Sequence, residues 1–351
     1  MESTEALPRT PEELTAEWLS SALGRTVSDL TVDRIVWGTA TKVLVDATYA
    51  DDPGPQGPPR TLCIKGGFQE SVRAYGMAAA YAIEAKFYER LAPAIELRLP
   101  SCWYAGIDEP AEQGIIVLDD LSAEGGTFGD PTAPWSADQV AAGLEQLAVL
   151  HGPTWDKSTD PHVSWLEVGA AAVRGVAPAL LSAEHWDSHF SLEGIPSLPS
   201  SLQDRDRVTH GMRRLWELDD AAVHCATHGD AHVGNTFIDT AGRPGFLDWQ
   251  TPCMAPAFYD AAYFITGALA PEIRRASEGD LIRHYLTALS AAGGPELGYD
   301  EAWIDYRRHA FHGFFWAVTP PVMQPVERVA AMGARHTTAI EDLDSYEALG
   351  V

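Results

Sequence analysis

Short apolar runs separated by glycine and proline occupy the first third of the chain. Residues 33–50, DRIVWGTATKVLVDATYA, predict two strands joined by a glycine turn, and residues 61–68, TLCIKGGF, predict a third strand. Residues 76–93, GMAAAYAIEAKFYERLAP, repeat apolar side chains at helical spacing and predict a helix. Residues 114–121, GIIVLDDL, predict a short apolar strand that turns abruptly acidic.

Apolar residues at helical spacing dominate the remainder of the chain. They occur in residues 136–151, 280–293 and 301–318, and each of these segments predicts a helix. We therefore expect an α+β fold of two lobes, a small β-rich lobe over 1–118 and a larger, mainly helical lobe over 119–351.

The charge balance is strongly acidic, with 24 Lys and Arg against 50 Asp and Glu and a formal net charge of -26. A field of this sign repels nucleic acid and anionic membrane surfaces, so we expect neither as a partner. It permits a cationic substrate without requiring one, because a high acidic content also serves solubility.

The N-terminal segment and the cysteines indicate the compartment. Residues 1–23 have no basic segment followed by an apolar one, and we expect a helix there with Thr10 as N-cap and Pro11 in its first turn. The four cysteines are widely spaced, which is typical of buried thiols in a reducing compartment. No apolar run approaches the length of a membrane span, so we expect a cytoplasmic protein.

Polar chemistry is concentrated in residues 227–250, THGDAHVGNTFIDTAGRPGFLDWQ. One interpretation is a zinc site, because two pairs of histidines at i, i+4 spacing would share a helix face. The residues of that interpretation are His224, Cys225, His228 and His232. Gly229 and Gly234 interrupt any helix there, so the spacing loses its geometric meaning and zinc is disfavoured.

The carboxylates of the same stretch support a second interpretation. Residues 236–239 and 245–248 predict two strands of an antiparallel hairpin, which brings Asn235 and Asp248 together. Their oxygen atoms suit Mg²⁺ that also holds phosphate oxygens. Asp230 lies five positions before Asn235, free to accept a nucleophile's proton, and the set matches the needs of phosphoryl transfer.

The motif HGDAHVGN resembles the H-G-D-x-x-x-x-N loop of the aminoglycoside phosphotransferase and choline kinase family, and LDWQ resembles its metal-binding aspartate segment. The segment PAFYDAAYFITGAL resembles the helix that follows, so the similarity spans roughly residues 38–269. The residues of these motifs are most similar to those of the ecdysteroid-kinase-like branch of the family. The resemblance implies a bilobal protein-kinase-like fold, with ATP and Mg²⁺ as cofactors.

The resemblance also implies a lysine for the α- and β-phosphates and a glutamate that fixes it. Lys65 matches the lysine, and it alternates in facing with Leu62 and Ile64; the alternative is an exposed lysine on an edge strand. Glu84 in the predicted helix matches the glutamate, with Glu70 as the competing candidate.

Two backbone segments complete the expected nucleotide site. The phosphate-covering loop is WGTATK, with Gly38 for close backbone approach and the hydroxyls of Thr39 and Thr41 as donors. It departs from G-x-G-x-x-G in having one glycine, and an ordinary β-turn is an equal alternative. We expect adenine to meet the backbone between Val117 and Leu121, a stretch that includes Asp119.

Three further polar residues are expected to be structural. His151 ends a helix and packs between elements, His228 braces the loop, and Asp260 caps or braces the loop that contains Asp230.

The sequence thus predicts an ATP-dependent O-phosphotransferase that acts on a hydroxyl of a small molecule. The segment 152–222 and the C-terminal helices are expected to build the acceptor pocket, as in relatives. Its tryptophans favour a hydroxylated lipid, terpenoid or macrocycle, whereas its acidic residues favour an aminoglycoside, and the choice stays open, as does the oligomeric state. The alternatives are a pseudokinase, which should have lost one of the key residues, and a protein kinase, which would need an activation segment after Asp248.

Overall fold

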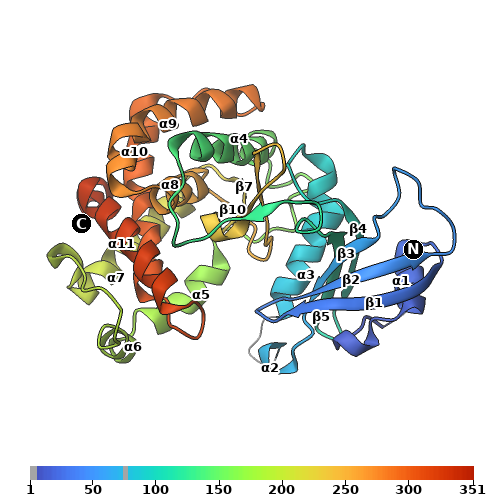
Figure 1. The fold of residues 1–351 in the computed structure, drawn as a ribbon. Helices are drawn as coiled ribbons and strands as arrows, with labels where there is room; N and C mark the ends of the chain where they lie inside the picture. Colours follow the sequence, from blue (N-terminus) through green and yellow to red (C-terminus); the bar gives the residue numbers. More distant parts are fainter. Residues whose placement is uncertain (1–5, 74–77) are drawn as a thin grey trace. The chain divides into compact units, whose positions relative to one another are not determined.

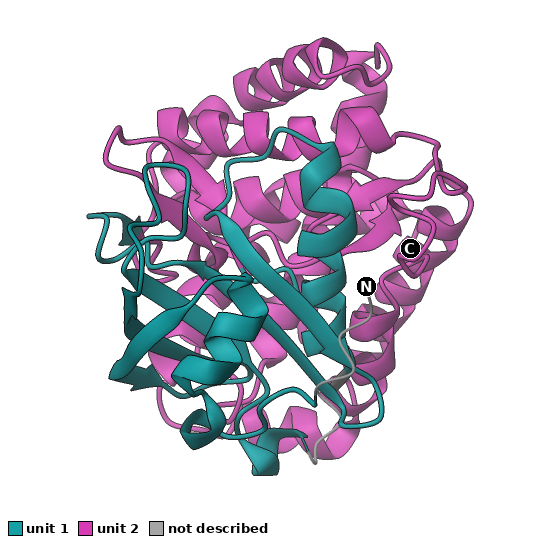
Figure 2. Ribbon diagram, turned by 90° about the vertical axis from the view of Figure 1, so that its right-hand side faces the viewer, with its two compact units in different colours: residues 1–127, 248–251 teal, residues 128–247, 252–351 magenta. Residues whose placement is uncertain are grey.

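The computed structural model describes residues 6–73 and 78–351. The chain forms two compact units (Figures 1 and 2). The first comprises Met1–Thr127 with Asp248–Thr251, and the second comprises Phe128–Leu247 with Pro252–Val351. The first unit is rich in strands and the second is mainly helical, which confirms the predicted α+β class.

An antiparallel sheet of five strands forms the first unit. Its elements are η1 (Pro11–Glu13), α1 (Ala16–Leu23), β1 (Val27–Val36), β2 (Thr41–Tyr49), β3 (Thr61–Gly66), α2 (Glu70–Val72), α3 (Ala78–Lys86), η3 (Phe87–Leu91), η4 (Ala92–Ala94), β4 (Cys102–Asp108) and β5 (Gln113–Asp119). The strand order is β1-β2-β3-β5-β4, so β3 is the central strand and has a partner on each side.

Alternation along the strands divides the side chains of this sheet between two faces. Leu62 and Ile64 of β3 are fully buried against Trp18 and Leu19 of α1 in one apolar core. Lys65 points to the opposite face, because successive side chains of a strand alternate. The face that carries Lys65 is the one on which α3 packs.

The first α-helix begins later than the sequence predicts. Thr10 precedes only the short 3₁₀ helix η1, and its side chain makes no capping hydrogen bond. The helix α1 starts at Ala16, and Thr15 is its N-cap, because the Thr15 hydroxyl accepts from the backbone N of Trp18 at 3.1 Å. The prediction of Thr10 as the cap of this helix was therefore wrong.

Helices build most of the second unit around one almost completely buried helix, α8. The elements are α4 (Ala137–Thr154), α5 (Ala171–Leu180), α6 (Ala183–His189), η5 (Ser200–Leu202), α7 (Arg205–Asp220), β7 (Cys225–Thr227), η6 (Val233–Asn235), β8 (Thr236–Ile238), β9 (Pro244–Phe246), β10 (Cys253–Ala255), α8 (Phe258–Ala268), α9 (Pro271–Ala291), α10 (Tyr299–His309), η7 (Ala310–Val318), α11 (Val326–Asp342) and α12 (Ser345–Leu349). The short β6 (Thr127–Phe128) spans the division between the units. Every residue of α8 is buried, so this helix is the scaffold of the unit.

The predicted hairpin of the second unit is confirmed. Strands β8 and β9 pair antiparallel, with Thr236 opposite Phe246 and Ile238 opposite Pro244. The backbone N of Leu247 donates to the carbonyl O of Asn235 at 2.8 Å, which extends the pairing by one step. Asp248 follows Leu247 directly in the chain.

Several elements differ from the sequence prediction. Strand β4 and the pairing of β7 with β10 have no counterpart in the predicted elements. Residues 301–318 do not form a single helix, because α10 ends at His309 and η7 continues as a 3₁₀ helix. The predicted helix over 76–93 begins partly outside the described residues and ends in non-α turns. None of the helices within 6–73 and 78–351 is long and apolar enough to cross a lipid bilayer.

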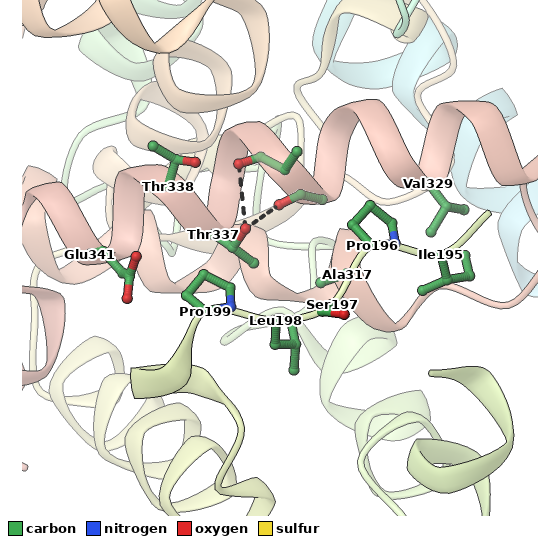
Figure 3. Close-up of a pocket in the computed structure, with 12 residues that line it drawn as sticks. Ile195, Pro196, Ser197, Leu198, Pro199, Ala317, Val329, Thr337, Thr338 and Glu341 are labelled. Carbon is green, nitrogen blue, oxygen red and sulfur yellow. Dashed lines mark hydrogen bonds between the residues drawn. The ribbon is translucent and has the colours of Figure 1, made fainter. Parts of the chain in front are cut away.

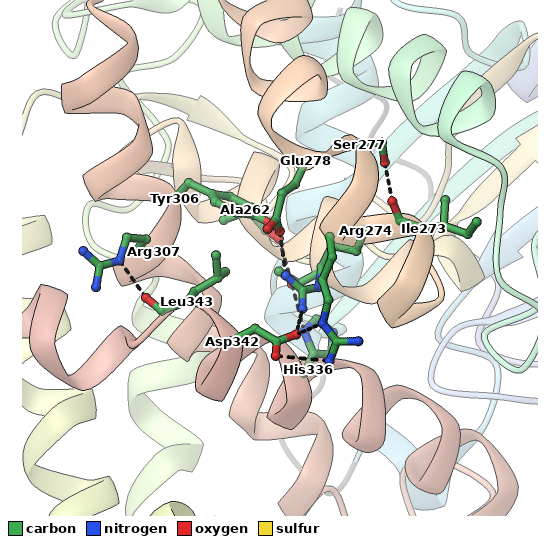
Figure 4. Close-up of polar contacts among 12 residues, drawn as sticks. Ala262, Ile273, Arg274, Ser277, Glu278, Tyr306, Arg307, His336, Asp342 and Leu343 are labelled. Atoms are coloured by element: carbon green, nitrogen blue, oxygen red, sulfur yellow. Dashed lines mark hydrogen bonds and ion pairs between the residues drawn. The ribbon is translucent and has the colours of Figure 1, made fainter.

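A buried ion network joins three helices of the second unit (Figure 4). Arg274 of α9 is 1% exposed, and it donates to Glu278 at 2.6 Å and to Asp342 of α11. The hydroxyl of Tyr306 on α10 donates to the same Glu278 oxygen at 2.8 Å. Arg275 also binds Asp342, at 2.7 Å. The network therefore fixes α9, α10 and α11 to one another.

Replacing Arg274 with methionine should lower the free energy of unfolding by about 3–5 kcal/mol, because Glu278 and Asp342 lose their shared cation. Arg214→Met is the matched control, since Arg214 pairs with Glu217 on the exposed surface of α7. We expect that change to cost under about 1 kcal/mol. Urea unfolding measures the free energy of unfolding of both variants. An equal loss of stability in Arg274→Met and Arg214→Met would contradict a structural role for the buried network.

Candidate functional site

Lys65 is the centre of the polar cluster in the first unit. It is 5% exposed, and its Nζ lies 2.7 Å from Glu84 Oε1 and 2.9 Å from Asp248 Oδ1. Burial alone would lower the pKa of Lys65, but the charges of Asp248 and Glu84 outweigh it and raise the pKa above its ordinary value. Lys65 is therefore a permanent cation held between two carboxylates.

The local fold explains this arrangement. Lys65 lies on the central strand β3, so the alternative of an exposed lysine on an edge strand was wrong. Glu84 on α3 is 3% exposed and faces Lys65, whereas Glu70 on α2 is exposed to solvent. Of the two glutamates considered from the sequence, the structure brings Glu84 to Lys65.

Asp248 has a strained backbone and a partly open side chain. Its φ is 65°, in the left-handed region that favours glycine, and its side chain is 34% exposed. The next residue, Trp249, donates from its backbone N to Glu84 Oε1 at 3.2 Å. Its ring stacks on Phe87 with 3.9 Å between ring centroids. These contacts hold Asp248 in the strained conformation.

The turn between β1 and β2 contains the predicted phosphate loop. The Tyr81 hydroxyl donates to the Thr39 carbonyl O at 2.6 Å and so anchors the turn to α3. Thr41 is 1% exposed, and its hydroxyl has no hydrogen-bond partner within the described residues. A Cβ at Gly38 would meet only the Ala40 carbonyl O, at 3.6 Å, so the fold itself leaves open space beside this glycine.

The two remaining predicted nucleotide residues lie on β5. Val117 is fully buried in the core of the sheet. Asp119 ends the strand, and its carboxylate accepts from Trp103 Nε1 at 2.7 Å and from the backbone N of Ser101 at 3.1 Å. The side chains of both residues are thus engaged within the first unit. Their backbone is paired as well, because Val117 lies opposite Ile64 and Tyr104 in the sheet and the backbone N of Asp119 donates to the Ser101 carbonyl O at 3.1 Å.

In the second unit, Asp260 braces the loop that contains Asp230. Its carboxylate accepts from the backbone N of His228 at 2.6 Å and of Gly229 at 3.0 Å. His151 Nε2 lies 3.2 Å from the same carboxylate, and His228 Nε2 binds the Leu247 carbonyl O at 2.8 Å. The structural roles expected for His151, His228 and Asp260 are confirmed.

Asp230 is held through both of its carboxylate oxygens. Asn235 Nδ2 donates to Oδ2 at 3.1 Å, and His232 Nε2 lies 3.5 Å from the same oxygen. The hydroxyl of Tyr263 donates to Oδ1 at 3.2 Å. Burial tends to raise the pKa of Asp230, but His232, His228 and the Tyr263 hydrogen bond outweigh it and lower the pKa to about 2. The side chain is nevertheless 44% exposed, so an ionised oxygen acceptor faces solvent.

Asn235 and Asp248 each carry an oxygen donor of the kind that suits a hard cation such as Mg²⁺. The Nδ2 group of Asn235 is committed to the backbone O and carboxylate of Asp230, which orients Oδ1 away from them. Amide and carboxylate oxygens are the ligands that Mg²⁺ prefers. Asp248 supplies a partly exposed carboxylate that follows the hairpin directly.

The histidines of the zinc interpretation are engaged with the backbone. His224 Nε2 binds the Asp219 carbonyl O, His232 Nδ1 accepts from the Gly234 N, and His228 braces the loop. In the described part of the chain, no group of three or more His, Cys, Asp or Glu side chains is arranged to hold a metal ion.

The sequence did not predict that Tyr263 and Trp316 take part in the hydrogen bonds around Asp230. Trp316 Nε1 donates to the Tyr263 hydroxyl at 2.6 Å, and Tyr263 in turn reaches Asp230. One signal was present: Asp260 and Tyr263 are three positions apart and so share a face of α8. Nothing in the sequence pattern connects Trp316 to either residue.

A groove of about 390 Å³ also occurs in the second unit (Figure 3). An extended segment, 195–199, runs alongside α11, and the groove contains none of the predicted site residues. In this groove the Thr337 hydroxyl donates to the Gly333 carbonyl O of its own helix. The Ser201 hydroxyl donates to Glu341 Oε1 at 2.7 Å. Its polar groups are thus partly satisfied within the protein.

Comparisons with known proteins point to one family. A model described as the phosphotransferase enzyme family matches residues 75–302, more than half of the chain. No curated protein matches the chain.

Similar solved structures include the apoenzyme of macrolide 2'-phosphotransferase MphH from Brachybacterium faecium, at 15% identity and a TM-score of 0.47, covering 90% of this chain and 96% of that one. Choline kinase LicA from Streptococcus pneumoniae is 14% identical with a TM-score of 0.47, and the match covers 94% of this chain and 97% of that one. The GDP complex of aminoglycoside 2'-phosphotransferase-IIIa is 9% identical with a TM-score of 0.48, and the match covers 95% of this chain and 99% of that one.

Proposed function

Because the chain belongs to the phosphotransferase enzyme family, we propose that it transfers the γ-phosphoryl group of ATP to a hydroxyl group of a small molecule. Family membership confirms the predicted enzyme class, and the nucleotide, the metal and the acceptor belong to the proposal. The observation that carries it is the ionised, half-exposed carboxylate of Asp230, held at one oxygen by Asn235 and at the other by Tyr263.

Asp230 is the proposed catalytic residue. Its exposed oxygen accepts a hydrogen bond from the acceptor hydroxyl and orients it toward phosphorus. A bond forms between that hydroxyl oxygen and the γ-phosphorus, and the bond from phosphorus to the bridging oxygen of ADP breaks. ADP leaves with the electron pair, and the hydroxyl proton passes to Asp230. Positioning supplies most of the catalysis, because the transition state of phosphoryl transfer is loose.

The nucleotide is proposed to bind to the lobe of residues 1–118. The acceptor is proposed to bind to the lobe of residues 119–351. Lys65 contacts the α- and β-phosphates while Glu84 fixes its ammonium group, as the 2.7 Å ion pair supports. The loop of Gly38, Thr39 and Thr41 covers the phosphates. The buried hydroxyl of Thr41, which has no partner among the described residues, supports this role because such a group is costly unless a ligand satisfies it.

The backbone between Val117 and Leu121, a stretch that includes Asp119, is proposed to meet adenine. The side chains of Val117 and Asp119 are engaged within the first unit, so the proposed contact would use main-chain groups of this segment.

Asn235 and Asp248 are the proposed Mg²⁺ ligands. The metal, when bound, would neutralise charge on the phosphate oxygens. The Oδ1 atom of Asn235 is oriented by the two hydrogen bonds of its amide group, and Asp248 is held in its strained conformation by Trp249. Each ligand is therefore positioned before the metal arrives.

Asp248→Ala should weaken Mg-ATP binding by at least about tenfold, because the cation loses its only proposed carboxylate ligand. Asp46→Ala is the control, since Asp46 pairs with Arg60 on the exposed surface of the same unit. Calorimetric titration with Mg-ATP compares the two variants with the unmodified protein. Unchanged affinity in Asp248→Ala would remove Asp248 from the metal site.

The reaction itself is tested by following ADP formation with a coupled assay. The protein is incubated with ATP, Mg²⁺ and pooled hydroxylated compounds, including aminoglycosides, macrolides, choline, sterols and hydroxy acids. We expect ADP formation that depends on an acceptor and stops when EDTA removes the metal. ADP formation that persists in excess EDTA would contradict the proposed metal dependence.

A further inference from the structure

Two hydrogen bonds connect η7 to Asp230 through α8. Trp316 Nε1 donates to the Tyr263 oxygen at 2.6 Å, and the Tyr263 hydroxyl lies 3.2 Å from Asp230 Oδ1. Indole Nε1 is a donor only, so the tyrosine oxygen accepts from Trp316 and directs its own proton to Asp230. The direction of both bonds is therefore fixed by the chemistry of the groups.

Packing holds Tyr263 in this orientation. Tyr263 is 7% exposed and Trp316 is 5% exposed. The Tyr263 ring stacks on His336 and meets His312 at an angle, each with 5.1 Å between ring centroids. Burial lowers the pKa of His312 to about 4 and that of His336 well below its ordinary value, so both rings are neutral packing partners at neutral pH.

A glycine makes room for this packing. A Cβ at Gly313 would lie 2.0 Å from His336 Nδ1, so His336 occupies space that only glycine leaves. Trp316 also packs edge-on against His232, with 5.1 Å between ring centroids, and His232 lies beside the other oxygen of Asp230. Trp316 thus supports both sides of the carboxylate.

We propose that Tyr263, oriented by Trp316, is a positioning residue that fixes the Asp230 carboxylate for attack by the acceptor hydroxyl, an inference that rests on the proposed function. With Oδ1 bound by Tyr263 and Oδ2 by Asn235, the carboxylate cannot rotate about its last bond without losing a hydrogen bond. Its remaining lone pairs then keep one direction toward the exposed side. Fixed geometry of this kind raises the fraction of bound acceptor that is aligned for reaction.

Tyr263→Phe removes the hydroxyl and keeps the ring. We expect kcat to fall roughly tenfold or more, because a hydrogen bond to a charged group is lost. The KM for ATP should stay within about twofold, since Lys65 and Asp248 are untouched. Steady-state kinetics at saturating acceptor measure both constants, and a thermal melt verifies that the variant is folded.

Tyr259→Phe is the matched control. Tyr259 lies one turn earlier on α8, is also buried, and its hydroxyl has no hydrogen-bond partner within the described residues. We expect its kcat to stay within about twofold of the unmodified protein, because no hydrogen bond to a charged group is removed. An equal loss of kcat in Tyr259→Phe and Tyr263→Phe would assign the effect to core packing and overturn the proposal.

The role of Trp316 is tested by a double-mutant cycle. Trp316→Phe removes the donor that orients Tyr263, so kcat should fall by a smaller factor than in Tyr263→Phe. In the double variant, kcat should match that of Tyr263→Phe alone, because both changes act through the same hydroxyl. Independent, multiplicative losses would show that Trp316 does not act through Tyr263.

The outcomes separate this inference from the proposed function. If the unmodified protein transfers phosphoryl groups and Tyr263→Phe keeps its full kcat, the positioning role fails and the function stands. If the unmodified protein transfers none to any acceptor while binding Mg-ATP, the proposed function fails, and the inference that rests on it fails with it.

Discussion

Asp230→Asn should reduce kcat by roughly a hundredfold to ten-thousandfold, the range that a positioned general base contributes. The amide keeps the shape of the side chain but accepts protons poorly, so the acceptor hydroxyl loses its proton acceptor. Mg-ATP affinity should stay within about twofold, because none of the proposed nucleotide contacts changes. Turnover and calorimetric titration measured on the same preparation check both expectations.

Asp239→Asn is the matched control for this change. Asp239 lies in the turn between strands β8 and β9, where its carboxylate accepts from the backbone N of Ala241 and of Arg243. Its asparagine variant keeps an oxygen for these bonds and should retain full turnover. If Asp230→Asn retained turnover within about threefold of the unmodified protein, the role of proton acceptor would be wrong.

Lys65→Met should abolish measurable Mg-ATP binding and destabilise the first unit. The side chain of Glu84 is 4% exposed, so removing its partner leaves a buried carboxylate without a cation. Breaking such a pair costs about 3–5 kcal/mol. Urea unfolding followed by tryptophan fluorescence gives the stability, and calorimetry gives the affinity.

A double variant separates the two effects of Lys65. Lys65→Met combined with Glu84→Gln removes the unpaired charge and keeps an oxygen for the Trp249 backbone N, so much of the stability should return. Nucleotide binding should not return, because the cation is still missing. Recovery of Mg-ATP affinity in the double variant would contradict direct contact between Lys65 and the phosphates.

Local patterns in the sequence predicted the parts of the site that depend on short-range geometry. The alternation of Leu62, Ile64 and Lys65 predicted which face of the strand the lysine occupies, because side chains of a strand alternate. The hairpin that begins after Asn235 was predicted from a turn composition between two apolar runs, and the antiparallel pairing of β8 with β9 confirms it. The family read from HGDAHVGN and LDWQ is confirmed as well, whereas the ecdysteroid-kinase-like branch stays a prediction.

Long-range contacts were beyond the sequence pattern. Tyr263 and Trp316 are 53 positions apart, and their hydrogen bond exists only because η7 packs beside α8. The break between α10 and η7 is similar in kind, since residues 301–318 are apolar at helical spacing and only packing decides between α and 3₁₀ turns. The start of α1 depended on which of two threonines caps it, and the sequence favoured Thr10 because proline follows it.

The most direct test of the central claim is the product. The purified protein is incubated with Mg-ATP and the pooled acceptors, and mass spectrometry searches for a compound heavier by one phosphoryl group, with Asp230→Asn as the blank. We predict one class of hydroxylated compound that gains the phosphoryl group with the unmodified protein and not with the variant. A phosphorylated product formed equally by both proteins, or no product with any acceptor despite tight Mg-ATP binding, would contradict phosphoryl transfer through Asp230.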